Sequence, residues 1–176
     1  MIKRIASIGL MTAFIAVCTY ISVPFTVPFT LQTFAVICSL ILLGGCDGTI
    51  AIAVYVLLGA LGLPVFSGFN GGIGHILGLT GGYIVGFIFM GLFYWVMEKQ
   101  TQKAAWVKYA VLAVGNLICY AFGTVWFAVV SANRGNPKSI PAILLICVVP
   151  YIIPDAVKLV LAVLISGRVK KAIKKK

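Results

Sequence analysis

Acidic side chains are almost absent from this sequence. Its 176 residues include three aspartates and glutamates against fourteen lysines and arginines, and all charged residues together make up 10% of the chain. A soluble domain has about 25% charged residues. The mean hydropathy is +1.14, so the composition predicts an integral membrane protein and excludes an ordinary soluble domain.

Residue types that catalyse reactions or hold metal ions are also scarce. The chain has one histidine, His75, and five scattered cysteines without a C-x-x-C pair. A zinc site has no suitable ligand spacing here, and no Ser/His/Asp set or pair of carboxylates suggests catalysis. We therefore expect no metal, no cofactor and no enzyme activity. His75 is interpreted as a packing or interfacial residue and the cysteines as small apolar packing residues.

Nucleotide-binding motifs are missing as well. A Walker A motif ends in Gly-Lys followed by Ser or Thr, and this ending occurs nowhere in the chain. The glycines between Gly72 and Gly78 have the wrong spacing for a dinucleotide loop and follow no βαβ pattern. The chain is not expected to bind ATP by these means.

Long apolar runs, in contrast, fill the sequence. They cover residues 5–22, 29–45, 49–63, 82–97, 105–131 and a last segment that starts near 140. A helix needs roughly 17 to 25 residues to cross a hydrocarbon core, a length that the third and fourth runs reach with their flanks. Five apolar runs follow the first, which favours an uncleaved span over a signal peptide. We predict an all-α membrane protein with six transmembrane helices in a single membrane domain, residues 1–176.

Two prolines divide the last segment, which is longer than one untilted span. Because apolar runs of about 10 to 14 residues are usually not spans, residues 139–149 are predicted to form a short re-entrant or interfacial helix. The final span is expected to begin at Pro154, since proline is tolerated at the first helical position. Asp155 would then lie in the first turn, near the positive end of the helix dipole.

Basic residues mark one side of the membrane. They precede the first span, connect the fourth and fifth spans, and follow the sixth: Lys3, Arg4, Lys99, Lys103, Lys108, Arg168, Lys170, Lys171, Lys174, Lys175 and Lys176. The opposite loops contain only Arg134 and Lys138 among lysines and arginines. By the positive-inside rule both termini are predicted to be cytoplasmic. The net charge of +11 thus indicates topology and an anchor to anionic lipid in the cytoplasmic membrane, and not a nucleic-acid surface.

Residues 62–83, between the third and fourth spans, form the most unusual loop, with eight glycines in 22 positions. Glycine permits positive φ and a close approach of the backbone, so Gly71 and Gly72 are expected to let the loop close over a ligand. The alternative is a close-packed turn. We favour the ligand, because a simple turn needs about two to eight residues.

Small residues recur at helical spacing, which lets helices approach closely in lipid. Most such pairs, for example Gly82 with Gly86, are expected to pack within the chain. Gly9 and Ala13 in the first span are candidates for contact with a partner subunit. Trp126 is interpreted as an interface anchor that could also line a site.

Polar residues are few within the predicted spans, and six of them are candidates for a site: Gln32, Asn116, Tyr120, Tyr151, Asp155 and Lys158. Ionisable groups inside a membrane suggest a functional site by default. Asp155 and Lys158 are at i and i+3 on one helix face, so they can neutralise each other and still offer an acceptor and a donor to a polar solute. The alternative is a salt bridge that only fixes the last helix, which we disfavour because buried pairs rarely out-stabilise apolar packing.

Four stretches, "FTLQTFAV", "YVLLGALGLPVFSGFNGGIGHILGLTGGYIVGF", "YAFGTVWFA" and "IPDAVKLVLA", resemble the BioY family, the biotin-binding S components of energy-coupling factor (ECF) transporters. The resemblance covers most of the chain in order. It implies a six-helix S component that captures biotin near the outer face, under the loops after the first, third and fifth spans. It also implies partners that drive uptake: a membrane coupling subunit of the EcfT type, docked on Gly9 and Ala13, and two ABC-type ATPase subunits.

The resemblance and the chemistry of biotin together suggest roles for individual residues. Asp155 is expected to accept from the ureido N–H groups. The donors to the biotin carbonyl or carboxylate are expected to be Lys158, Gln32, Asn70 and Asn116, and the apolar walls to be Phe66, Tyr83, Tyr120, Tyr151 and Trp126. Which end of biotin meets which group stays open. So do two other classes of function: a proton-coupled transporter that acts alone, with Asp155 as carrier, and a membrane enzyme.

Overall fold

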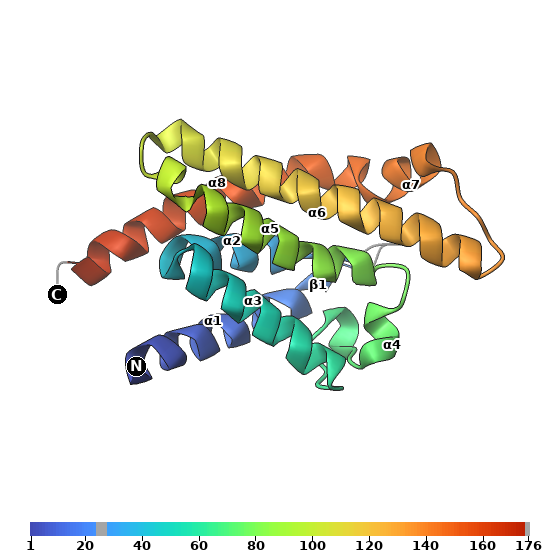
Figure 1. Cartoon of the computed structure of the whole chain (residues 1–176), viewed down its shortest axis with the longest axis horizontal. Helices are drawn as coiled ribbons and strands as arrows, with labels where there is room; N and C mark the ends of the chain where they lie inside the picture. The colour runs from blue at the N-terminus through green and yellow to red at the C-terminus, as the bar shows by residue number, and fades with distance from the viewer. Residues whose placement is uncertain (24–27, 175–176) are drawn as a thin grey trace.

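The computed structural model describes residues 1–23 and 28–174, and nearly all of them are helical. The elements in chain order are α1 (Ile2–Tyr20), β1 (Ser22–Val23), β2 (Phe29–Thr30), α2 (Gln32–Leu43), α3 (Gly45–Ala60), the 3-10 turn η1 (Ser67–Phe69), α4 (Ile73–Ile76), α5 (Gly81–Thr101), α6 (Ala105–Asn133), α7 (Ile140–Cys147) and α8 (Val149–Lys174) (Figure 1). Part of the first predicted loop, together with Lys175 and Lys176, lies outside the described residues.

The long helices form one bundle with two distinct ends. α5 and α6 share the most extensive contact, and α2 packs against α8, α3 and α1. Both termini lie at one end, here called the terminal end, together with the α5–α6 connection (Figure 1). The β1–β2 hairpin, α4 and α7 lie at the opposite end, here called the loop end.

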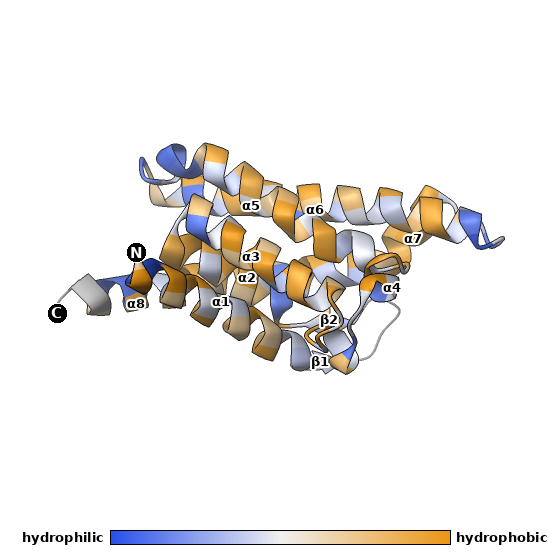
Figure 2. Ribbon diagram, turned by 60° about the horizontal axis from the view of Figure 1, so that its bottom comes forward, coloured by the Kyte–Doolittle hydropathy of each residue, from blue (hydrophilic) through white to orange (hydrophobic). Residues whose placement is uncertain are grey.

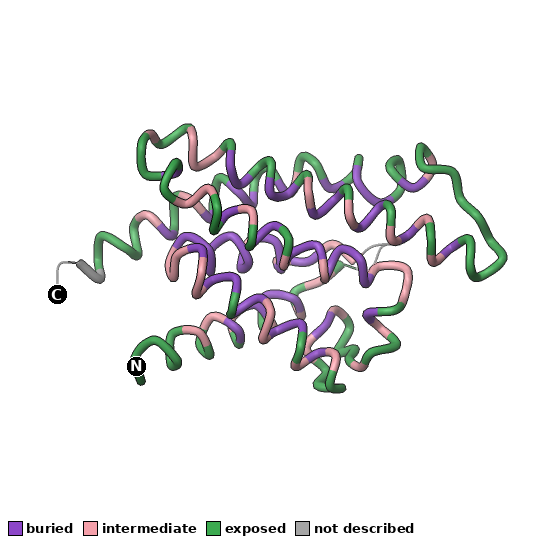
Figure 3. The backbone as a smooth tube through the Cα atoms, in the orientation of Figure 1, coloured by how far each residue is buried: buried purple, intermediate pink, exposed green. Residues whose placement is uncertain are grey.

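Length divides the apolar helices of the bundle into two groups. Four helices are long and apolar enough to cross a membrane, namely α1, α5, α6 and α8, whereas α2 and α3 have 12 and 16 residues. At 1.5 Å per residue α2 extends about 18 Å, less than the hydrocarbon core of about 30 Å. Nine of its 12 residues are buried, so α2 lies inside the bundle (Figure 3).

The second predicted span, 29–45, is wrong at its start. Phe29 and Thr30 belong to strand β2, where they pair with Val23 and Ser22 of β1 in antiparallel register. Pro28, which has no N–H to donate, comes directly before this strand. The helix therefore begins at Gln32, which places its first turn in the interior at the loop end.

The final helix also begins elsewhere than predicted. The short helix expected within 139–149 is present as α7, but α8 starts at Val149 and carries Pro154 inside it, so Asp155 is not in its first turn. Neighbouring helices allow a proline to interrupt the ladder of a membrane helix. Here the turn before Pro154 is held by Tyr151, which is buried in a cluster with Tyr83 and Tyr120.

Small residues bring α5 and α6 together, as their spacing predicts. A Cβ atom at Gly123 would overlap the Tyr83 ring, and one at Gly86 would come within 2.9 Å of the Cys119 sulfur. Apolar side chains on the outer faces, such as Leu117, Val125 and Val157, stay exposed. Figure 2 shows hydrophobic residues along the bundle and hydrophilic ones at its two ends. This is the surface of a multi-pass membrane protein.

Candidate ligand-binding site

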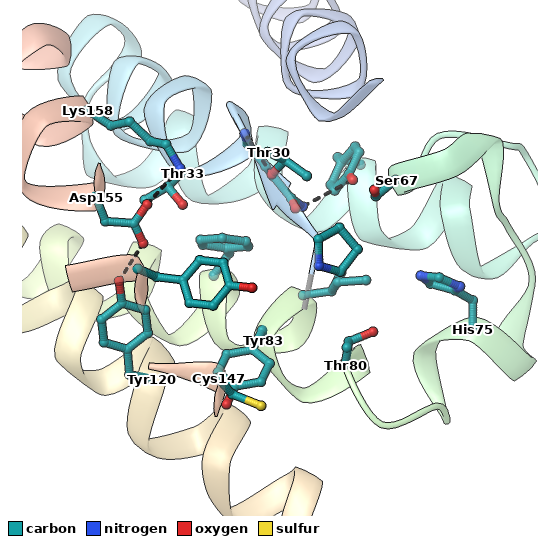
Figure 4. A pocket seen from close by; sticks show the side chains of 16 residues that line it. Thr30, Thr33, Ser67, His75, Thr80, Tyr83, Tyr120, Cys147, Asp155 and Lys158 are labelled. Carbon is teal, nitrogen blue, oxygen red and sulfur yellow. Dashed lines mark hydrogen bonds and ion pairs between the residues drawn. The ribbon is translucent and has the colours of Figure 1, made fainter. Parts of the chain in front are cut away.

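A cavity at the loop end collects side chains from nearly every part of the fold (Figure 4). Its lining residues are Pro28, Thr30, Gln32, Thr33, Tyr55, Ser67, His75, Thr80, Tyr83, Ile84, Phe87, Tyr120, Cys147, Tyr151, Asp155 and Lys158. Among the helices of the described chain, α1 alone contributes none of them. The site therefore depends on the tertiary arrangement and not on a single local motif.

Asp155 and Lys158 form a buried ion pair on one face of α8, as their spacing predicts. The Lys158 ammonium donates to Asp155 Oδ1 at 2.8 Å, and the two side chains are only 7% and 6% exposed. The Tyr120 hydroxyl of α6 donates to the other carboxylate oxygen, Oδ2. Lys158 Nζ also lies 3.9 Å from the centroid of the Phe29 ring, a cation–π contact. The carboxylate is thus held by two donors from two helices.

A second polar group lies where α2 begins. The Gln32 side-chain amide donates to the Tyr55 hydroxyl of α3 at 3.1 Å, and this hydroxyl donates to the Val65 carbonyl at 3.2 Å. Thr30 and Thr33 line the cavity beside Gln32. β2 and the first turn of α2 thereby place an amide and two hydroxyls in the same cavity wall as the charged pair of α8.

Aromatic rings supply the apolar part of the wall. Tyr83, Tyr120 and Tyr151 all line the cavity, as does Phe87. Tyr151 stacks on Phe29 with ring centroids 6.4 Å apart, and the Tyr83 hydroxyl is 3.4 Å from Thr124 Oγ1. The cavity can therefore hold a ligand that combines hydrogen-bonding groups with an apolar body.

Family membership follows from comparison with known proteins. A family model described as the BioY family matches residues 1–175. The chain belongs to the BioY family. It is 40% identical over 171 residues to the biotin transporter BioY of Thermotoga maritima, with 96% of each chain covered. It is 33% identical over 152 residues to the biotin transporter BioY of Rhizobium etli, with 81% of this chain and 78% of the relative covered.

The fold is also similar to a solved structure. A crystal structure of the S-component for biotin from an ECF-type ABC transporter matches this BioY-family chain with a TM-score of 0.82 and 26% identity. The match covers 97% of this chain and 92% of the other. These relatives are transporter proteins and not enzymes.

Several residues proposed from the sequence lie outside the cavity lining. Asn70 is exposed and donates to the Ser67 carbonyl at 2.7 Å. Gly71 packs against the carbonyl of Leu63, and Gly72 has a φ of +91° with its N–H bonded to the Gly59 carbonyl at 2.6 Å. These three residues contact the backbone of the loop and of the end of α3, and they are not among the residues that line the cavity.

Three other residues support the wall from behind. Phe66 is fully buried, and the centroid of its ring lies 5.6 Å from that of the Tyr55 ring and 5.3 Å from that of the His75 ring. Asn116 is buried on α6, four residues before Tyr120 and on the same face of the helix. Trp126 donates to the Gly78 carbonyl at 3.0 Å and packs on Gly82. These contacts connect α6 to residues 62–83, here called the glycine loop.

Several residues line this BioY-family cavity that were not predicted from the sequence to do so: Thr30, Thr33, Tyr55, Ser67, His75, Thr80 and Cys147. Hydroxyl groups in membrane helices usually bond to their own backbone, as Ser39 does to the Ala35 carbonyl, so a hydroxyl alone is no signal. His75 packs on Phe66 as a packing residue should, and it lines the cavity too. Burial lowers the pKa of its imidazole, which favours the neutral ring.

Proposed function

We propose that this BioY-family chain is the substrate-binding subunit of an ATP-driven ECF transporter and that it captures biotin for uptake across the cytoplasmic membrane. One observation carries the proposal: a cavity with a buried, hydrogen-bonded Asp155–Lys158 pair and an aromatic wall, in a chain whose relatives are named biotin transporters. The S-component fold supports the same assignment.

The chemistry of biotin suits the lining residues. Biotin has a ureido ring with two N–H donors and a carbonyl, an apolar thiophane with a valeryl chain, and a carboxylate. Asp155 already accepts one hydrogen bond at each oxygen, yet an ionised carboxylate has about four acceptor sites. It can therefore accept from the ureido N–H groups, while Lys158 and Gln32 donate to the biotin carbonyl or carboxylate. Tyr83, Tyr120 and Tyr151 pack against the apolar body.

Residues behind the lining contribute indirectly. Phe66 supports His75 and Tyr55, and Trp126 fixes the loop of residues 62–83. Asn116 lies one turn before Tyr120 on the same buried face of α6. Asn70, Gly71 and Gly72 set the conformation of the loop that carries Ser67 and His75 to the cavity.

The proposed topology has six spans in one membrane domain, with α2 and α3 crossing together with their flanking residues. Lysines and arginines at the terminal end support cytoplasmic termini, so the loop end faces outward. The proposed partners are a coupling subunit of the EcfT type and two ABC-type ATPases. Gly9 and Ala13 are exposed on α1, which leaves this face open to the coupling subunit.

Reconstitution of the purified chain alone tests the proposal. In liposomes it should bind radiolabelled biotin saturably, but it should not accumulate biotin on addition of ATP, because the sequence has no phosphate-binding motif. Lipoic acid, which has a valeryl chain but no ureido ring, serves as the control ligand and should not compete. ATP-driven accumulation by the chain alone would contradict the subunit role, and accumulation driven by a proton gradient would favour a transporter that acts alone.

A further inference from the structure

A second cavity, of about 390 Å³, lies at the terminal end, on the opposite side of the bundle from the candidate biotin site. Three lysines line it: Lys103 in the α5–α6 connection, Lys108 in the first turns of α6, and Lys170 near the end of α8. They come from separate segments and meet only in the folded chain. No step in biotin capture uses them.

The charge of this cavity is positive. Glu98 is the one acidic residue in its lining, and its Oε2 accepts the Gly45 N–H at 3.0 Å. Three lysines therefore share the cavity lining with one carboxylate, which is hydrogen-bonded to the backbone of α3. Exposed Arg168 and Lys171 on α8 add to the positive field around the cavity.

Tryptophans place this cavity at the level of the lipid headgroups. Trp106 is 73% exposed on the first turn of α6, and Trp95 is 48% exposed near the end of α5. Exposed tryptophans of membrane proteins concentrate at the membrane–water interface. Figure 2 shows the hydrophilic residues of the α5–α6 connection directly beside the apolar length of the two helices. The cavity mouth thus borders both water and acyl chains.

We propose that this terminal-end cavity binds the headgroup of an anionic phospholipid. The phosphate would lie among Lys103, Lys108 and Lys170, since basic pockets between membrane helices suit anionic headgroups. Ile41 and Tyr94 provide apolar surface on the inner side of the same cavity. A lipid fits this site better than free phosphate, because the site lies at headgroup depth between apolar helix surfaces. The inference does not depend on biotin binding.

Native mass spectrometry of the full chain, titrated with phosphatidylglycerol or phosphatidylcholine, tests the proposal. The test variant K103Q/K108Q removes two lysines from the cavity. The control K99Q/K171Q removes two exposed lysines that do not line it, so both variants have the same net charge. One lysine near an anionic surface is worth about fivefold in affinity. K103Q/K108Q should therefore weaken phosphatidylglycerol binding at least about fivefold, and the control clearly less. Both should bind biotin like the parent, which shows that they fold.

Each other result overturns the proposal. If both double variants lose the same affinity for phosphatidylglycerol, the effect is one of overall charge and not of this cavity. If the parent binds phosphatidylglycerol and phosphatidylcholine equally well, the cavity does not recognise the headgroup. Displacement of phosphatidylglycerol by equimolar inorganic phosphate would identify a free-phosphate site. If K103Q/K108Q binds lipid like the parent but no longer assembles with the energising subunits, the lysines belong to a protein interface.

Discussion

Asp155 is the residue on which the candidate site depends most. It is buried, and within the part of the chain that the structure describes its partners are the Lys158 ammonium and the Tyr120 hydroxyl. A buried charge that loses a partner is costly, because the remaining charge or polar group is left uncompensated. Stability and ligand affinity should both respond to changes in these three residues.

Tyr120→Phe tests the hydroxyl donor without changing the ring. Hydrogen bonds to charged groups contribute about 1.5 to 3 kcal/mol, so this variant should unfold at a clearly lower temperature in detergent than the parent. Tyr83→Phe is the matched control, because Tyr83 lines the same cavity but its hydroxyl is 3.4 Å from the neutral Thr124. Equal thermal midpoints for the two variants would show that Tyr120 contributes nothing special to the carboxylate.

Residues that are chemically out of place in an apolar helix could be predicted as site residues from the sequence. An aspartate, a lysine and a glutamine are costly in an apolar helix, so Asp155, Lys158 and Gln32 stood out, and all three line the cavity. Tyr55 and Thr33 did not stand out, because hydroxyl-bearing residues are common in membrane helices. Their place in the wall depends on how α2 and α3 pack, which a single sequence does not reveal.

At the scale of elements, the glycine loop between α3 and α5 acts as the support for one side of the cavity. It carries Ser67, His75 and Thr80, and its shape depends on Gly72, whose φ of +91° and ψ of 157° suit glycine almost exclusively.

Gly72→Val should therefore shift these three side chains. Strain of this kind costs of order 1 to 3 kcal/mol, so biotin should bind roughly fivefold or more weakly in a calorimetric titration. Gly74→Ala is the control: Gly74 lies in α4, and a Cβ there would meet no atom within 4 Å. Parent-like affinity of Gly72→Val would reduce the loop to a simple connector.

The first helix has a different role in the proposal, because it lines no part of the cavity. A Cβ at Gly9 would meet nothing within 4 Å in the described chain, so Gly9→Leu should leave folding and biotin affinity unchanged. Its association with a coupling subunit should weaken about tenfold, the effect of roughly 1.4 kcal/mol, as judged by co-purification. Gly167→Leu on α8, where the space is also open, should associate normally. Normal association of both variants would place the docking face elsewhere.

Element boundaries were harder to predict than element types. The apolar pattern located six helices: α1, α2, α3, α5, α6 and α8. It could not show that Phe29 and Thr30 pair with β1 and so delay the start of α2. Nor could it show that burial of Tyr151 keeps the turn before Pro154 helical. In both cases a tertiary contact overrides a local preference.

On the scale of the whole molecule, the two ends of the bundle have different chemistry. The loop end contains a cavity around one ion pair, whereas the terminal end carries most of the lysines and the exposed Trp95 and Trp106. This division fits a protein that captures its ligand at one face and meets lipid and energising partners at the other. The central claim is that biotin binds at the Asp155–Lys158 pair.

Calorimetric titration of biotin into the parent, Asp155→Asn and Lys158→Ala tests this claim most directly. Ser166→Ala is the control, because Ser166 is buried on α8 but does not line the cavity. Each pair variant removes a charge-assisted hydrogen bond and leaves its partner uncompensated. Affinity should fall at least about tenfold in both, equivalent to roughly 1.4 kcal/mol, while Ser166→Ala binds like the parent and all the proteins stay monodisperse. Unchanged affinity in the two pair variants would mean that the pair only fixes α8 and that biotin binds elsewhere.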